Sequence, residues 1–228
     1  MKWIYFFCLL ALVHVQADPQ ADTLKQQVLV ELPKIAGWCS LEKASHFIDL
    51  IIETQPKVCV EIGVFAGSSL FPVASALRFL GEGIVIGIDP WDQWECIKYF
   101  TSKMDDVHLK WWMHVDLESI YHSYCAMLKK FSLENYCLTI RATSEMAVSQ
   151  IPSIDILYID GNHSELSYVQ DVQLYLPKVN PGGYIWINDT LNINAQVALE
   201  CLMKQCDFIK TIDKGNCILF KKRMKRYE

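Results

Sequence analysis

The sequence predicts an open, doubly wound α/β fold, in which helices cover both faces of a mostly parallel β-sheet. The first observation is an alternation of strand-like and helix-like segments along most of the 228 residues. The second is that the strand-like segments are apolar throughout, which is typical of parallel strands buried on both faces. The third is the composition, with 52% hydrophobic and 21% charged residues, which supplies a core and argues against global disorder.

The individual elements follow one another in a regular order. Helices are expected at residues 22–33, 40–54, 68–80, 115–131, 144–149, 164–176 and 192–206. Strands are expected at residues 57–63, 83–89, 137–142, 154–160 and 182–189, with a final hairpin at residues 207–220. Ser40 is a candidate N-cap, Pro177 ends a helix, and Lys214 with Gly215 marks the hairpin turn.

Residues 90–114 form the one long connection without a clear element, and they are rich in Trp, Tyr and Phe. Two interpretations stay open. The segment is either a lid or pocket wall over the carboxyl edge of the sheet, or a hydrophobic insertion packed on the core.

The N-terminus has the pattern of a secretory signal peptide. Lys2 precedes an apolar run over residues 3–15, and the small residue Ala17 is the expected cleavage position. We therefore predict a signal peptide at 1–17, a helical segment at 18–57 and the main domain at 58–228. The protein is then exported, to a periplasm, the ER lumen or the outside of the cell. An uncleaved membrane anchor and a buried N-terminal helix are the alternatives.

The net charge and the number of cysteines exclude few classes of function. The net charge is −5, so we expect no nucleic-acid partner, and the basic cluster at residues 221–226 is interpreted as a solvated C-terminus. Nine cysteines include Cys8 in the leader, and the remaining even number permits disulfides. Cys59 and Cys137, however, lie in expected strands, where cysteine is commonly a small buried hydrophobe.

The stretch VCVEIGVFAGSSL, residues 58–70, places a glycine loop directly after the first strand. Ligands of doubly wound sheets bind at such carboxyl ends, where glycine allows the backbone to approach closely. The dinucleotide pattern GxGxxG is absent, because Phe65 stands between Gly63 and Gly67. Glu61 would also repel a pyrophosphate, which disfavours a nicotinamide dehydrogenase.

A cationic ligand without phosphate fits this loop better. S-adenosylmethionine (SAM) carries an ammonium, a sulfonium and one carboxylate. Glu61 is expected to bind the ammonium, while Ser68, Ser69 and the following helix start bind the carboxylate. Asp89, at the end of the second strand, is expected to accept hydrogen bonds from the ribose hydroxyls.

The same residues resemble class I methyltransferases, and among them the metal-dependent O-methyltransferases of small molecules. That group includes the catechol and caffeoyl-coenzyme A type and bacterial relatives that act on sugars and antibiotics. The loop resembles their motif E-x-G-x-aromatic-x-G-x-S, which Glu61, Gly63, Phe65, Gly67 and Ser69 match position by position.

Two later stretches extend the resemblance to about residues 40–220. GIDPW is similar to the second motif, which implies cofactor contacts for Asp89 and Trp91. RATSEM is similar to the adenine-side segment, which implies that Thr143 and Ser144 lie near the base. The resemblance also implies a Rossmann-like sheet of seven strands in the order 3-2-1-4-5-7-6, with an antiparallel C-terminal hairpin strand.

Polar residues end the fourth and fifth expected strands. Asp160, Asn188 and Asp189 should meet at the carboxyl edge, where two carboxylates and an amide oxygen suit Mg²⁺. The resemblance implies the same ion, although Asn188 and Asp189 stand in the reverse order of the catechol type. Asp160 is also expected to contribute to cofactor binding and to catalysis.

His163 stands three residues after Asp160, where the catechol type has a lysine and some sugar-modifying relatives have a histidine. A histidine titrates near neutrality and suits a general base for a hydroxyl whose pKa a metal has lowered. The alternative is that His163 only caps the next helix.

The sequence therefore predicts a SAM-dependent, metal-assisted O-methyltransferase that acts on a small-molecule hydroxyl. The alternative is a methyltransferase-fold protein that binds SAM or another ligand without O-methyl transfer. We expect no membrane association after cleavage, and a homodimer is a further option.

Overall fold

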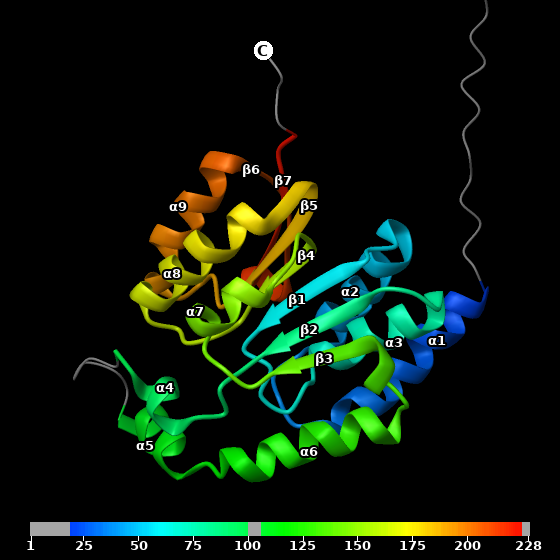
Figure 1. Cartoon of the computed structure of the whole chain (residues 1–228), viewed down its shortest axis with the longest axis horizontal. Helices are drawn as coiled ribbons and strands as arrows, with labels where there is room; N and C mark the ends of the chain where they lie inside the picture. Colours follow the sequence, from blue (N-terminus) through cyan, green and yellow to red (C-terminus); the bar gives the residue numbers. More distant parts are fainter. Residues whose placement is uncertain (1–18, 100–105, 225–228) are drawn as a thin grey trace, which may run out of the picture.

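The computed structural model describes residues 19–99 and 106–224 of the chain. Its centre is one seven-stranded sheet with the order β3-β2-β1-β4-β5-β7-β6 (Figure 1). The strands are β1 Val58–Ile62, β2 Ile84–Ile88, β3 Cys137–Ile140, β4 Ile154–Ile159, β5 Val179–Asn188, β6 Cys206–Ile212 and β7 Cys217–Lys222. Strands β1 to β5 pair in parallel, whereas β7 is antiparallel to both β5 and β6. The predicted fold class and strand order are confirmed.

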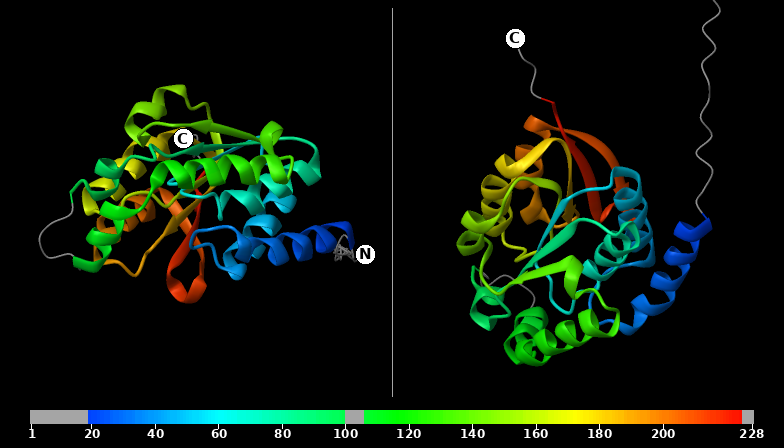
Figure 2. Two further views of the ribbon diagram at one scale, coloured as in Figure 1. Left: turned by 90° about the horizontal axis from the view of Figure 1, so that it is seen from below. Right: turned by 45° about the vertical axis from the view of Figure 1, so that its right-hand side comes forward.

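Helices cover both faces of this sheet (Figures 1 and 2). The helices of the described residues are α1 Pro19–Glu31, α2 Leu41–Thr54, α3 Leu70–Leu80, α4 Gln93–Ile97, α5 Asp106–His114, α6 Leu117–Lys130, α7 Ser144–Ala147, α8 Glu165–Tyr175 and α9 Gln196–Gln205. Short 3₁₀ turns lie at Leu32–Lys34, Glu134–Tyr136, Val148–Gln150, Leu176–Lys178, Ile193–Ala195 and Asp213–Gly215. Helices α1, α2, α3 and α6 pack on one core, and α7, α8 and α9 pack on the other.

The central strands are buried on both sides, as their apolar sequences predict. In β4, Leu157 and Ile159 belong to the core under α8 and α9, whereas Ile156 and Tyr158 belong to the core under α2 and α3. Because side chains alternate across a strand, Glu61 of β1 points to the same side as its register partner Tyr158.

Several boundaries differ from the expected ones. The helix expected at 192–206 begins only at Gln196, because Asn192 caps a 3₁₀ turn before it. Strand β5 begins at Val179, three residues early, and pairs with Ile154 across a register shift. Residues 90–114 are not wholly irregular, since Asp92 caps α4 through its side chain and α5 follows.

The predicted N-terminal helical segment is part of the main core. Ser40 caps α2 as expected, by accepting a hydrogen bond from the backbone N–H of Lys43 at 3.1 Å. The predicted signal peptide, residues 1–17, lies outside the described residues. In the part of the chain that the structure describes, no helix is long and apolar enough to cross a membrane, and all eight cysteines are free thiols.

Candidate active site

The glycine loop after β1 lies against the end of β4 at the carboxyl edge. Gly63 has φ +85°, and a Cβ atom there would lie 2.1 Å from the carbonyl oxygen of Asp160. Gly67 has φ +84°, and a Cβ atom there would lie 2.8 Å from the ring of Tyr124. Both positions therefore require glycine, for conformation and for space.

Asp89 holds this loop in place. Its Oδ2 accepts backbone hydrogen bonds from Val64 and Phe65, both at 2.9 Å, and its Oδ1 accepts one from Trp91 at 2.7 Å. The indole N–H of Trp91 donates to the carbonyl of Phe65 at 2.8 Å. Burial raises the pKa of Asp89, and these backbone donors partly offset that effect. A carboxylate accepts about four hydrogen bonds, so acceptor capacity is left for a hydroxyl ligand.

Glu61, Ser68 and Ser69 are engaged within the protein. The Ser69 hydroxyl donates to Glu61, which is only 2% exposed. Burial raises the pKa of Glu61 well above its ordinary value, although the Ser69 hydrogen bond opposes this. The Ser68 hydroxyl accepts from the backbone N–H of Cys39 at 3.3 Å. Their contacts with the methionine part of SAM stay predictions.

Asp160, His163 and Asp189 come together at the ends of β4 and β5, with candidate ligand atoms all within 4.8 Å of one another. Nε2 of His163 lies 2.9 Å from Oδ2 of Asp189 and 3.7 Å from Oδ1 of Asp160. Asp189 adopts a left-handed conformation with φ 51°, which turns the chain sharply at the end of β5. The three chemistry-bearing residues thus share one small volume.

The charges of this cluster depend on one another. Burial alone would lower the pKa of His163, but its contacts with Asp160 and Asp189 outweigh burial and raise it to about 10. For Asp189 the effects have the opposite signs. Burial raises its pKa, but the contact with His163 outweighs burial, so the pKa is lowered overall. Tyr158 donates to Oδ2 of Asp160 at 2.7 Å, and Asn216 donates to Oδ1 of Asp189 at 2.8 Å. The two carboxylates therefore favour the protonated form of the imidazole.

Asn188 lies beside Asp160, as its sequence position predicted, and its role as a metal ligand stays a prediction. Its Oδ1 accepts a hydrogen bond from Nζ of Lys43 at 3.1 Å, and its Nδ2 donates to Oδ1 of Asp160 at 2.9 Å. Asn188 therefore connects Asp160 of the cluster to a lysine of α2.

Lys43 is the principal site residue that sequence reasoning missed. A signal was available, because Lys43, Phe47 and Ile51 are spaced four residues apart and share the buried face of α2. Lysine side chains are rarely buried, so the spacing alone did not predict that Lys43 faces the site.

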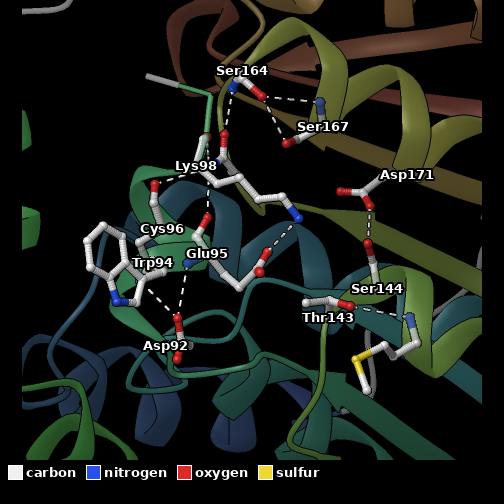
Figure 3. Close-up of polar contacts among 12 residues, drawn as sticks. Asp92, Trp94, Glu95, Cys96, Lys98, Thr143, Ser144, Ser164, Ser167 and Asp171 are labelled. Carbon is white, nitrogen blue, oxygen red and sulfur yellow. Dashed lines mark hydrogen bonds and ion pairs between the residues drawn. The ribbon is translucent and has the colours of Figure 1, made fainter. Parts of the chain in front are cut away.

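The expected adenine-side residues lie at the start of α7 (Figure 3). Thr143 caps this helix by accepting from the backbone N–H of Met146 at 3.3 Å. Ser144 donates to Oδ1 of Asp171 on α8, and its own carbonyl accepts from the Tyr175 hydroxyl at 2.7 Å. The segment is thereby fixed to α8.

Asn162 attaches the segment around α4 to the loop that carries His163. Its Nδ2 lies 3.0, 3.0 and 3.1 Å from the carbonyl oxygens of Glu95, Cys96 and Lys98, which share its two N–H donors. Glu95, Cys96 and Lys98 lie close together in Figure 3. Cys96 of α4 and Trp112 of α5 both pack against the core, as the interpretation of an insertion packed on the core predicted. A lid or pocket wall over the carboxyl edge stays a prediction.

Comparison with known proteins identifies the family of this chain. A family model described as a methyltransferase domain matches residues 60–190, more than half of the chain. The chain belongs to this methyltransferase family. An uncharacterized protein, R132, of Acanthamoeba polyphaga mimivirus is 32% identical over 151 residues, which cover 63% of this chain and 58% of that relative. The match thus spans less than two thirds of the viral protein.

Solved structures share the fold of this methyltransferase domain. The O-methyltransferase NovP has a TM-score of 0.66 at 15% identity, over 90% of this chain and 98% of that one. The O-methyltransferase TomG from Streptomyces achromogenes, in complex with SAM, has a TM-score of 0.59 at 15% identity over 93% of both chains. An O-methyltransferase from Bacillus cereus, in complex with SAH, gives 0.56 at 13% identity over 92% and 94%.

Aromatic rings cover one side of the glycine loop in this methyltransferase domain. The rings of Trp38 and Phe65 have centroids 4.9 Å apart, and Trp111 lies 5.7 Å from Trp38. Trp38 is nonetheless 63% exposed. An apolar surface is therefore available beside the loop.

Proposed function

We propose that this protein is a SAM-dependent O-methyltransferase that acts on a hydroxyl group of a small molecule. One observation carries the proposal: Gly63 of the glycine loop packs directly on the backbone of Asp160. A ligand held by that loop would lie beside the Asp160, His163 and Asp189 cluster, so methyl donor and proton-handling groups would share one site. The family match and the likeness to O-methyltransferases support this reading.

A divalent cation fits the same cluster. Carboxylates are preferred ligands of Mg²⁺, which commonly binds to one or two of them and to substrate oxygens. Asp160 and Asp189 would hold such an ion. When bound, it supplies positive charge that lowers the pKa of an acceptor hydroxyl and offsets the two carboxylates beside His163.

The residues of the chain have distinct roles in this proposal. Asp89 fixes the loop and accepts from the ribose of the methyl donor. The neutral form of His163 accepts the proton of the acceptor hydroxyl. In the transfer, a carbon–oxygen bond forms to the acceptor oxygen while the carbon–sulfur bond breaks, which leaves S-adenosylhomocysteine. Trp38, Phe65 and Trp111 would exclude water from the acceptor side.

We also propose that the protein acts outside the cytosol, because of its leader sequence. SAM is made in the cytosol, so an exported methyltransferase needs a supply in the compartment where it acts.

Calorimetric titration of the purified protein with SAM, with and without Mg²⁺, tests the proposal. We expect micromolar binding that Asp89→Ala abolishes. Asp155→Ala is the matched control, because Asp155, like Asp89, accepts hydrogen bonds from backbone N–H groups. Its donors are Lys57 and Val58, at 2.8 and 3.0 Å, and they lie at the amino ends of the strands, away from the candidate site. Folded protein that binds no SAM in either condition would contradict the proposal. Binding without methyl transfer to any of a panel of vicinal diols and phenols would favour a ligand-binding protein.

A further inference from the structure

Lys43 is a buried lysine beside the candidate site. The residue is 2% exposed, although lysine side chains usually reach solvent. Within residues 19–99 and 106–224, its Nζ group makes one hydrogen bond, to Oδ1 of Asn188 at 3.1 Å. An ammonium can donate three hydrogen bonds, and burying it with few partners costs free energy. A purely structural role is therefore a poor explanation of this lysine.

The two neighbours of Asn188 fix the orientation of its amide. An ammonium only donates hydrogen bonds, and a carboxylate only accepts them. The amide oxygen must therefore face Lys43, and the amide NH₂ group must face Asp160, which it reaches at 2.9 Å. If the amide turned its oxygen toward a cation beside Asp160, its NH₂ group would meet the ammonium. Both hydrogen bonds would then be lost, and donors would face each other.

We propose that Lys43 is a positioning residue that keeps Asn188 out of the coordination sphere of the divalent cation. The carboxylates of Asp160 and Asp189 are then the protein ligands, in place of the Asp–Asn–Asp set that the sequence suggests. The charge of Lys43 also repels the ion, so the site binds it weakly unless a substrate completes it. This inference rests on the proposed function only in assuming that a cation binds there.

Binding of Mn²⁺ to the full chain tests the inference, with the free ion measured by electron paramagnetic resonance. We expect Asp189→Asn to weaken binding by about tenfold or more, because a charged ligand is lost. Asn188→Ala should change affinity by no more than about twofold, because the amide contributes no ligand atom. Lys43→Met keeps the apolar stem and removes the charge, so it should tighten binding by about tenfold or more.

Two further variants separate this effect from others. Lys57→Met is the matched control, because Lys57 pairs with Glu82 at the opposite edge of the sheet and its loss should leave affinity unchanged. The double variant Lys43→Met with Asn188→Ala should lose part of the gain, because the freed amide oxygen is no longer present. A folding defect lowers affinity, so it cannot produce the expected gain.

The inference is overturned if Asn188→Ala weakens binding as much as Asp189→Asn, or if Lys43→Met does not tighten it. A wild type that binds no Mn²⁺ at millimolar concentration, beside a Lys43→Met variant that does, supports it. Absence of binding in both overturns it. The SAM titration of the Asp89 variant decides the proposed function separately, since it needs no cation.

Discussion

The hydroxyl of Ser144 donates a hydrogen bond to Oδ1 of Asp171, and this contact joins α7 to α8 (Figure 3). Asp171 is 4% exposed, and its Oδ2 lies close to Gly161, one residue after Asp160. Burial raises the pKa of Asp171 to about 7, against the opposing effect of the Ser144 hydrogen bond. The carboxyl group therefore changes its charge near neutrality while it is enclosed by the fold.

This burial predicts a pH-dependent stability. The folded pKa of about 7 lies above the ordinary value of 3.8, so the folded state binds the proton more tightly than the unfolded state. The stabilisation is complete below the unfolded pKa and is lost as the pH rises through the folded pKa. We expect the free energy of unfolding to fall by a few kcal/mol from this group between about pH 4 and about pH 8.

Asp171→Asn should remove that dependence, because asparagine has no charge and still offers an oxygen to Ser144. Urea unfolding of both proteins across this pH range measures the difference. Parallel pH profiles would show that Asp171 does not titrate as expected.

Gly63→Ala should destabilise the protein far more than Gly81→Ala. Both glycines have positive φ, +85° and +74°, but a Cβ at Gly81 meets nothing within 4 Å. We expect Gly81→Ala to lower the free energy of unfolding by about 1 kcal/mol, from the backbone conformation alone. Gly63→Ala adds a collision with the Asp160 carbonyl and should cost several kcal/mol more, on the order of other strained or overpacked sites. If urea unfolding showed equal losses of unfolding free energy for the two variants, the glycine loop could move away from β4 without cost.

His163→Gln should lower kcat and leave SAM affinity unchanged. The expected loss is about a hundredfold or more, which is typical when a general base is removed. His122→Gln is the control, because His122 is an exposed residue of α6 that faces Glu118 at 3.6 Å. Turnover with an acceptor found in the diol and phenol screen measures the effect. Full activity of His163→Gln would assign proton removal to another group.

Export should remove the first 17 residues. N-terminal sequencing of protein secreted from a eukaryotic host should begin at Asp18, because Ala17 provides the small residue before the cut. A replacement of Ala17 by Arg should block this cleavage. Mature protein that still begins at Met1 and sediments with membranes would favour the uncleaved anchor.

The sequence was a good guide wherever local pattern and sheet geometry agree. Apolar strands predicted a sheet buried on both faces, and polar residues at their carboxyl ends predicted that Asp160, Asn188 and Asp189 would meet. Side-chain positions that depend on long-range packing could not be predicted from the sequence. Local periodicity shows that Lys43 faces the core, but it cannot show that the side chain ends beside Asn188.

The same reason explains why the contacts of Asn188 were not predicted. Its residue type and position suggested an oxygen ligand, but the direction of its amide depends on a lysine 145 positions away in the chain. In residues 90–114 the many aromatic residues mask the periodicity of the two short helices α4 and α5, although Asp92 is a readable N-cap signal.

The side chain of Asn162 connects the α4 segment to the loop that carries His163. One amide group holds three carbonyls of the α4 segment, and its oxygen accepts from the backbone N–H of Ser164 at 2.9 Å. His163 lies between these two residues. A chimera that exchanged the α4 segment for that of another enzyme would therefore break the support of the neighbouring imidazole. Any exchange of the α4 segment would therefore have to include residues 162–164 as well, because this one side chain connects the two segments.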